Sequence, residues 1–255
     1  MQYYDGYETF TPPTTDNAVD AAEYPWRQLG GFVAFSGLES IQNRGQEQAI
    51  DIVEARLKKL EANLKNQFST SLFSDGTGSG GKEFAGFRLF VSDTPSAAGT
   101  VGGINQVTNA FWRNQVSASA AFNTTNAMQR MNTLYLQCIR GAEAPDLIVA
   151  DSNTFGVFEA TQQQLQRFTS EKLAAAGFLS YRYKSADVVY DDSCPVNRMY
   201  FLTTSSFAFR YARDRWFSVG ETRTVTNADY EVTPIWVAGN LTCNNRALNG
   251  VLIAA

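Results

Sequence analysis

The residues best placed to do chemistry lie in a glycine-rich segment that begins at Asp75. Gly76, Gly81 and Lys82 have the spacing of a loop that cradles nucleotide phosphates. Position 83 is Glu83, where such a loop needs the hydroxyl of Ser or Thr to bind magnesium, and a carboxylate there would lie beside phosphate oxygens. The segment before the loop is charged and helix-forming rather than a buried strand. The pattern therefore favours a junction between elements, with a P-loop NTPase kept as an alternative.

Other catalytic arrangements have little support. The chain has no histidine, which removes the commonest general base and metal ligand. Asp191 and Asp192 form an adjacent acid pair that could hold a divalent cation, but the residues that follow, Ser193 to Asn197, predict a polar turn. No serine lies in a GxSxG motif. We expect no catalytic residue, no metal site and no cofactor, and therefore not an enzyme.

The three cysteines also predict packing rather than chemistry. Cys138, Cys194 and Cys243 are widely spaced and include no CxxC pair. This pattern favours neither a zinc site nor a disulfide framework. We expect three small apolar side chains in a core.

Basic and aromatic residues gather in one short stretch of the chain. They are Arg210, Tyr211, Arg213, Arg215 and Trp216. Such a group can stack on nucleic-acid bases, but Asp214 neutralises part of its charge. Because Arg and aromatic residues are also the usual anchors of protein interfaces, the pattern favours a subunit contact.

Composition predicts a globular protein with a substantial core, since 44% of the 255 residues are hydrophobic and 13% are aromatic. The net charge of -4 argues against a protein that binds nucleic acid by neutralising phosphates. No apolar run approaches the ~20 residues of a membrane span, and the first residues have no export signal pattern.

Two long elements are predicted first along the chain. Strands Tyr3–Phe10 and Tyr24–Phe35 form a hairpin arm around a turn at Pro12 and Pro13. A two-stranded ribbon is too small to be stable alone, so this arm must lie on another part of the molecule or on a neighbouring subunit.

A capping box then starts a long helix. Ser36 and Glu39 have the spacing of that motif, and apolar residues recur at helical spacing as far as Phe68, which predicts one helix of about 30 residues. A helix that lies across a sheet is favoured over a coiled coil. Gly45 is the candidate position for a bend.

The rest of the chain alternates helices and strands. The predicted elements are a strand Phe87–Ser92, a helix Asn126–Arg140, a strand Asp146–Asp151, a helix through Phe168, and strands Asp187–Tyr190, Arg198–Thr204, Phe207–Tyr211, Glu231–Val237 and Gly250–Ala254. The fold class is therefore α+β.

The order of these segments, more than any one motif, resembles a tailed-bacteriophage major capsid protein of the HK97-like fold. The motifs that carry the resemblance follow the hairpin and the capped helix. They are DGTGSGGK, TVGGINQVTNAFWRNQ, PDLIVAD, CPVNRMYFL and WVAGNLTCNNRALNGVLIA. The resemblance covers nearly the whole chain.

The resemblance implies three regions. Residues 1–37 would be an extended hairpin arm, the E-loop. Residues 38–74 and 206–237 would form a peripheral domain with its spine helix, and residues 75–205 and 238–255 an α/β axial domain. Family members carry a further N-terminal arm, and often a scaffolding segment, ahead of the hairpin, whereas here Met1 opens directly on the first predicted strand. Two explanations stay open: the chain is truncated or renumbered, or it is a natural form whose lattice closes without that arm.

The resemblance further implies a structural protein that assembles as pentamers and hexamers into the icosahedral shell around the phage genome. It would enclose double-stranded DNA without sequence-specific binding, have no membrane partner, and meet portal, scaffolding or decoration proteins. Its location would be the virion capsid, after assembly in the host cytoplasm. An encapsulin-like shell of the same fold is the alternative.

Candidate subunit-interface residues lie in the arm, in the predicted long helix, in the turn at Asp191 and in the stretch of Arg and aromatic residues. They are Pro12, Pro13, Trp26, Arg27, Glu47, Glu54, Asp191, Asp192, Arg210, Arg213, Arg215 and Trp216.

Overall fold

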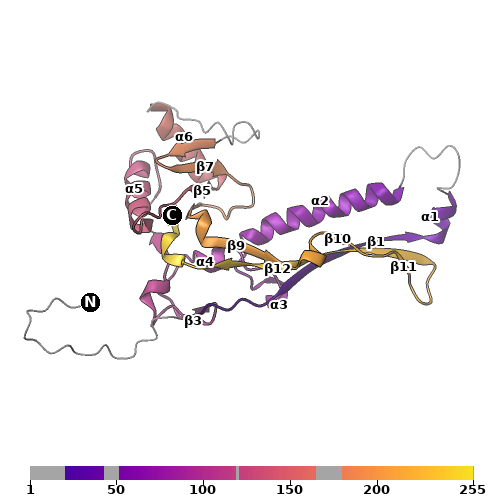
Figure 1. Ribbon diagram of the computed structural model, residues 1–255. Coiled ribbons are helices and arrows are strands. Elements are labelled where there is room, and N and C mark those ends of the chain that lie inside the picture. The colour runs from indigo at the N-terminus through magenta and orange to yellow at the C-terminus, as the bar shows by residue number, and fades with distance from the viewer. Residues whose placement is uncertain (1–20, 43–51, 119–120, 165–179, 255) are drawn as a thin grey trace, which may run out of the picture.

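A computed structural model of the protein describes residues 21–42, 52–118, 121–164 and 180–254. These residues form a compact part with a six-stranded sheet and a long, narrow extension with a second sheet and helix α2 (Figure 1). The mixed helix and strand content confirms the α+β class.

The sheet of the compact part is mixed, with strand order β4-β13-β8-β5-β7-β6. Its strands are β4 (Gln115–Ser117), β5 (Leu147–Ala150), β6 (Ser180–Tyr183), β7 (Ala186–Tyr190), β8 (Arg198–Leu202) and β13 (Gly250–Ile253). The helices packed with it are α5 (Ala127–Cys138) and α6 (Ser152–Gln164). Strands β4 and β13 are parallel, as are β5 and β7, while the other neighbours are antiparallel.

Both faces of this sheet are buried. Side chains alternate between the faces of a strand, so Ile148 and Ala150 join the cluster that contains α5 and α6. Val149, between them, joins a second cluster on the opposite face with Phe73 and Phe90. A strand buried on both faces has a continuous apolar sequence, which is why the run around β5 was predictable.

The extension is built on one strand, β12 (Tyr230–Cys243), which pairs with every other strand of the five-stranded sheet. Those strands are β1 (Arg27–Ser36), β9 (Phe207–Tyr211), β10 (Ser218–Val219) and β11 (Arg223–Thr224). β1 pairs antiparallel with β12 along all ten of its residues. β9 pairs with the C-terminal part of β12, nearest the compact part (Figure 1).

The predicted hairpin arm is only partly within the described residues. Its second strand is present as β1, and the described partner of β1 is β12. The first predicted strand, Tyr3–Phe10, and the turn at Pro12 and Pro13 lie outside the described residues.

The predicted long helix is two helices, α1 (Gly37–Gln42) and α2 (Ile52–Leu72). Arg56 Nη2 of α2 lies 2.7 Å from Glu39 Oε1 of α1, although the two residues are 17 apart in sequence. One straight helix would separate them by about 25 Å along its axis, so the prediction of a continuous helix is wrong. Gly45, the expected bend, lies outside the described residues.

The capping box predicted at the start of the helix is confirmed, and ion pairs stabilise the second helix. The N–H of Glu39 donates to Ser36 Oγ, and the N–H of Ser36 donates to Glu39 Oε2, both at 3.2 Å, which is the predicted capping box. The ion pairs Lys58–Glu54 and Lys65–Glu61 each measure 2.7 Å on the exposed face of α2.

The predicted strand Phe87–Ser92 is wrong, because this segment forms the short helix α4 (Phe87–Phe90). The adjacent side chains of Phe90 and Val91 are both fully buried in one cluster. A strand would direct them to opposite faces, whereas a helical turn lets both face the same core.

The remaining elements are short. They are α3 (Gly78–Gly81), β2 (Thr100–Val101), β3 (Ile104–Asn105), and the 3-10 turns Ala110–Trp112, Thr204–Ser206, Arg213–Arg215 and Arg246–Leu248. The three cysteines are free and buried, as expected. Burial raises the pKa of Cys138 to about 12, so its thiol stays protonated and unreactive at neutral pH.

A fully buried arginine lies where the chain passes from β12 to β13. Arg246 Nε donates to the Phe90 carbonyl at 2.6 Å, Nη1 to Gln106 Oε1 at 3.2 Å, and Nη2 to Asn114 Oδ1 at 3.3 Å. All three acceptors are uncharged, and burial lowers the pKa of Arg246 to about 10. The guanidinium thus joins α4 and the loop around β2 and β3 to the C-terminal segment.

Two buried asparagines make similar connections. Asn240 Oδ1 accepts from the N–H of Ala85 at 2.8 Å, and its Nδ2 donates to the Pro25 carbonyl at 2.8 Å. Asn249 Oδ1 accepts from the N–H of Thr203 at 2.8 Å. The asparagine-rich motif near the C-terminus therefore satisfies backbone groups of segments that are distant in sequence.

Replacing Arg246 by leucine should destabilise the fold by at least about 3 kcal/mol, because three buried acceptors would lose their donor. Thermal or urea unfolding measures this loss. Arg213→Leu, which removes an exposed arginine, is the matched control and should stay within about 0.5 kcal/mol of the unchanged chain. Equal stability of the two variants would refute the role assigned to Arg246.

Candidate functional site

The glycine-rich loop does not have the geometry of a phosphate site. Ser74 Oγ donates to Glu83 Oε2 at 2.6 Å, and the Glu83 carboxylate lies against Gly78 so closely that a Cβ there would be 2.4 Å from it. Asp75 Oδ1 accepts from the N–H of Thr77 at 3.0 Å. The Glu83 carboxylate therefore fills the space that a phosphate would need, and the Asp75 carboxylate already accepts from a backbone N–H that would otherwise be available to a phosphate.

The loop instead turns the chain sharply after α2. Gly76, Gly80 and Gly81 have positive φ angles of 75°, 68° and 78°, a conformation that favours glycine. Lys82 is at its C-terminal end, where its N–H donates to the Gly78 carbonyl at 3.2 Å. This geometry agrees with the interpretation of the segment as a junction.

Asp191 and Asp192 lie in a polar turn between β7 and β8, as predicted, and their carboxylates are used separately. Asp191 Oδ1 accepts from the N–H of Ser193 at 2.8 Å, whereas Asp192 Oδ1 accepts from the Tyr190 hydroxyl at 3.1 Å. In the part of the chain that the structure describes, no group of three or more potential ligands could hold a metal ion. The turn also exposes the apolar side chain of Val196.

Some of the predicted Arg and aromatic residues come together on the extension. Tyr211, Arg215 and Trp216 make contacts there with one another or with Trp236, and we name these four residues the Arg–aromatic cluster. Arg210 lies between Phe209 and Tyr211 on β9, so its side chain is on the opposite face of that strand, and Arg213 is exposed in the 3-10 turn that follows. The rings of Tyr211 and Trp216 are in contact in a tilted arrangement, with centroids 4.7 Å apart and planes inclined by 36°. The guanidinium of Arg215 lies 5.7 Å from the centroid of the Trp236 ring. Both tryptophans remain more than a third exposed.

The two faces of the β1–β12 pair differ in their covering. On the inner face Val33 is buried, and a Cβ on Gly31 would be 2.7 Å from Leu60 Cδ1 of α2. On the opposite face, Phe32 is 69% exposed and Trp236 is 38% exposed.

We name that second surface the outer face. It consists of Phe32 and Ala34 of β1 with their partners Pro234 and Val232, and of Trp236 opposite Gly30. Directly opposed residues of an antiparallel pair share a face, so these apolar groups are adjacent. An apolar surface of this kind is typical of a protein contact.

The other predicted interface residues are scattered. Trp26 precedes β1 and is 66% exposed, while Arg27 begins that strand and is half-buried. Glu54 is paired with Lys58. Pro12, Pro13 and Glu47 lie outside the described residues.

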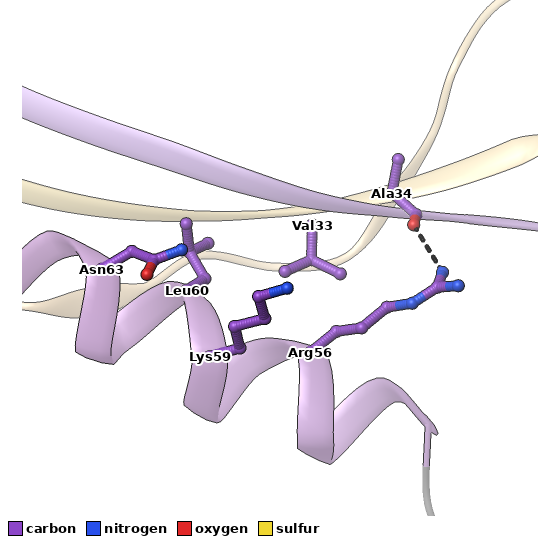
Figure 2. Close-up of a pocket in the computed structure, with 6 residues that line it drawn as sticks. All are labelled: Val33, Ala34, Arg56, Lys59, Leu60 and Asn63. Carbon is purple, nitrogen blue, oxygen red and sulfur yellow. Dashed lines mark hydrogen bonds between the residues drawn. The ribbon is translucent and has the colours of Figure 1, made fainter.

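An open groove of about 240 Å³ runs between α2 and β1 (Figure 2). It is lined by Val33, Ala34, Arg56, Lys59, Leu60 and Asn63. Arg56 closes one end, where its Nη1 donates to the Ala34 carbonyl at 3.1 Å and its guanidinium pairs with Glu39. Sequence analysis missed this groove, since it depends on how α2 lies on β1.

Among the described residues, no helix has the length and apolar character to span a membrane.

No protein-family model and no curated protein matches the sequence. Solved structures do match its fold. The capsid asymmetric unit of cyanophage A-1(L) aligns with a TM-score of 0.67 at 16% identity, covering 89% of this chain and 76% of that chain. The capsid of an empty GTA particle aligns with a TM-score of 0.61 at 18% identity, covering 91% of this chain and 74% of that one.

An encapsulin also matches. The holo-SrpI encapsulin complex from Synechococcus elongatus PCC 7942 aligns with a TM-score of 0.62 at 9% identity, over 91% of this chain and 75% of that chain. The chain therefore has the HK97-like fold that is shared by phage capsids and an encapsulin, which confirms the predicted fold.

The Glu39–Arg56 pair predicts that the hydrogen exchange of α1, at the end of the extension, depends on pH. Hydrogen bonds from Arg56 and from the Ser36 N–H lower the pKa of Glu39 to about 2 from its ordinary value of 4.5. Because the folded pKa is depressed, the contact is fully present above the ordinary pKa and is lost as pH falls from about 4.5 towards 2. Hydrogen exchange of α1, corrected for intrinsic rates, should rise across that window.

The variant Glu39→Gln should show fast exchange in α1 already at neutral pH, with little further change on acidification. Glu54→Gln removes an exposed ion pair of α2 and serves as the control, so α1 should behave in it as in the unchanged chain. A pH response of α1 that survives Glu39→Gln would contradict this assignment.

Proposed function

We propose that this chain is a major capsid protein that self-assembles into the icosahedral shell enclosing a phage genome. The observation that carries the proposal is the agreement of fold with capsid structures over about 90% of the chain. A protein of this shape has much surface available for contact, and its outer face and Arg–aromatic cluster expose the residue types that anchor interfaces. The activity would be assembly rather than catalysis, without a cofactor.

The proposed regions follow the described elements. The extension, with α2 and the strands β9 to β12, would contain the peripheral domain, and the six-stranded sheet with α5 and α6 would be the axial domain. β1 would belong to the arm of residues 1–37. Pentamers and hexamers would use the loops of the axial domain around their axes, including the turn at Asp191 and Asp192.

The candidate interface residues keep their proposed roles. Trp26 and the Arg–aromatic cluster would contact neighbouring copies, because these exposed rings combine apolar area with adjacent positive charge. Repetition of modest contacts by symmetry would close the shell. Portal, scaffolding and decoration proteins would be further partners, and the product would be located in virions after assembly in the host cytoplasm.

An encapsulin-like shell is the second candidate, favoured by the structural match to an encapsulin at a TM-score of 0.62. The two functions differ in what the shell encloses. Electron microscopy of the purified protein should reveal closed shells in both cases. Particles from infected cells that protect double-stranded DNA from nuclease would support the capsid, whereas particles that retain a protein cargo and no DNA would support the second candidate. A discrete monomer at all concentrations would contradict both.

Assembly should depend on the outer face. Phe32→Ser should leave the unfolding temperature nearly unchanged, because the side chain is 69% exposed, while it sharply reduces the yield of shells. Phe32→Tyr keeps the ring and should assemble normally. Light scattering and electron microscopy measure the yield, and normal shells from Phe32→Ser would show that this face is not a contact.

A further inference from the structure

The exposed side of helix α5 in the compact part combines an apolar centre with two positive charges. Asn132 and Leu136 are four residues apart, so they lie on the same side of the helix. The Lys184 ammonium, from the turn between β6 and β7, donates to Asn132 Oδ1. Arg140 follows the helix, and its Nη1 donates to the Gln137 carbonyl at 2.9 Å. We name Asn132, Leu136, Arg140 and Lys184 the α5 surface.

The two charges of the α5 surface are not neutralised within the described residues. Neither Lys184 nor Arg140 belongs to an ion pair there, in contrast to the paired lysines of α2. Glu143, the acidic residue nearest to Arg140 in sequence, accepts from the Ser205 hydroxyl at 3.2 Å instead. The Leu136 side chain between the two charges is 55% exposed.

This combination defines the chemistry of a partner. Carboxylates would pair with Lys184 and Arg140, while an apolar side chain would cover Leu136. The apolar centre favours a protein over a nucleic acid, because phosphates would meet the two cations and leave Leu136 exposed.

The turn between β7 and β8 has the matching chemistry. It carries the carboxylates of Asp191 and Asp192, and its Val196 side chain is 65% exposed. The turn is also held in place from within, since the N–H of Asn197 donates to Asp151 Oδ2 at 2.8 Å. A preorganised turn loses little freedom when it binds.

The α5 surface and this turn are at opposite ends of the six-stranded sheet. Lys184 precedes β7, and Asp191 directly follows it, so the five residues of β7, about 16 Å, separate them. Because β7 is paired on both edges, with β5 and β6, its two ends cannot meet within one copy. A contact between these surfaces must therefore join two copies.

We propose that the α5 surface receives the turn of residues 191–197 from a second copy of this chain. Such a head-to-tail contact uses two different surfaces of each copy, and it closes into a ring when the rotation between copies allows it. The inference rests on the proposed function and deepens it, because it names the surface that each turn would meet in a pentamer or hexamer.

Charge reversal tests the contact. Arg140→Glu and Asp192→Lys should each raise the protein concentration needed for assembly at least about twofold at low salt, as measured by light scattering, because opposite charges become like charges. Both changes in one chain should restore assembly, since each reversed surface then meets a reversed turn. Asp192 is preferred to Asp191 because its side chain is exposed and does not accept from the backbone of the turn.

The control is Lys82→Glu combined with Asp192→Lys. Lys82 is exposed in the junction after α2, outside the α5 surface, so this pair has the same net charge as the first double variant and should not restore assembly. Thermal unfolding of each variant shows whether the fold is kept.

A second experiment needs neither shells nor charge changes. Leu136→Cys and Val196→Cys are combined in one chain, and the concentrated protein is treated with a short bis-maleimide that links nearby thiols. The three native cysteines are buried and should not react. The double variant should give a ladder of linked multimers on a denaturing gel, whereas each single variant should give none.

The outcomes separate this inference from the proposed function. Failure of Arg140→Glu with Asp192→Lys to restore assembly in a folded protein would overturn the inference, and so would the absence of a ladder from the cysteine pair. Shells formed by the unchanged chain would leave the proposed function standing in either case. Rescue and a ladder from a chain that forms rings but never shells would support the contact and contradict the proposed function.

Discussion

The architecture depends on one strand having partners on both of its edges. A two-stranded ribbon the length of β1 would be marginal in water, yet β12 pairs with β1 on one side and with β9, β10 and β11 on the other. The resulting sheet is wide enough to offer α2 an apolar inner face, with Ile235 and Val237 buried beneath it. Because the same strand reaches the compact part at Cys243, the position of the extension is fixed by backbone hydrogen bonds rather than by a linker.

The point where β12 ends needs a different kind of stabilisation, because loops with unpaired backbone groups meet there. Arg246, Asn240 and Asn249 supply hydrogen bonds to these groups from buried side chains. A buried guanidinium without a carboxylate partner is costly in isolation, and here carbonyl and amide oxygens surround it. Such a network specifies one arrangement of the loops, since any other would leave several buried groups unsatisfied.

Local signals in the sequence predicted local structure well. The capping box at Ser36, the helix that ends at Cys138 and the apolar strand at Val149 each depend on neighbours within a few residues, and all are present. The single long helix and the strand at Phe87 were wrong because tertiary packing decided them. Glu39 meets Arg56 only when two helices fold against each other, and Phe90 enters the core only as part of a helical turn.

The same distinction applies to the candidate sites. The sequence predicted a junction rather than a phosphate loop at Glu83 and a polar turn rather than a metal site at Asp191, and both carboxylates accept hydrogen bonds within turns. The sequence did not identify the outer face, because β1 is a nearly continuous apolar run in which both faces look alike. Only its pairing with β12 shows that Phe32 lies on the exposed face and Val33 on the buried one. Residues that shape turns could thus be inferred from their neighbours, whereas surfaces for contact appear only once strands and helices are placed together.

The assembly proposed above would give these exposed rings a physical consequence. An isolated pair of copies would lose much of the gain from burying Phe32 or Trp236 to the entropy of association. In a closed lattice, each further copy meets several neighbours while its freedom is lost only once, so weak contacts become sufficient together. Weak individual contacts also let a misplaced copy dissociate before the shell closes, which favours surfaces with exposed rings and single charges over one extensive interface.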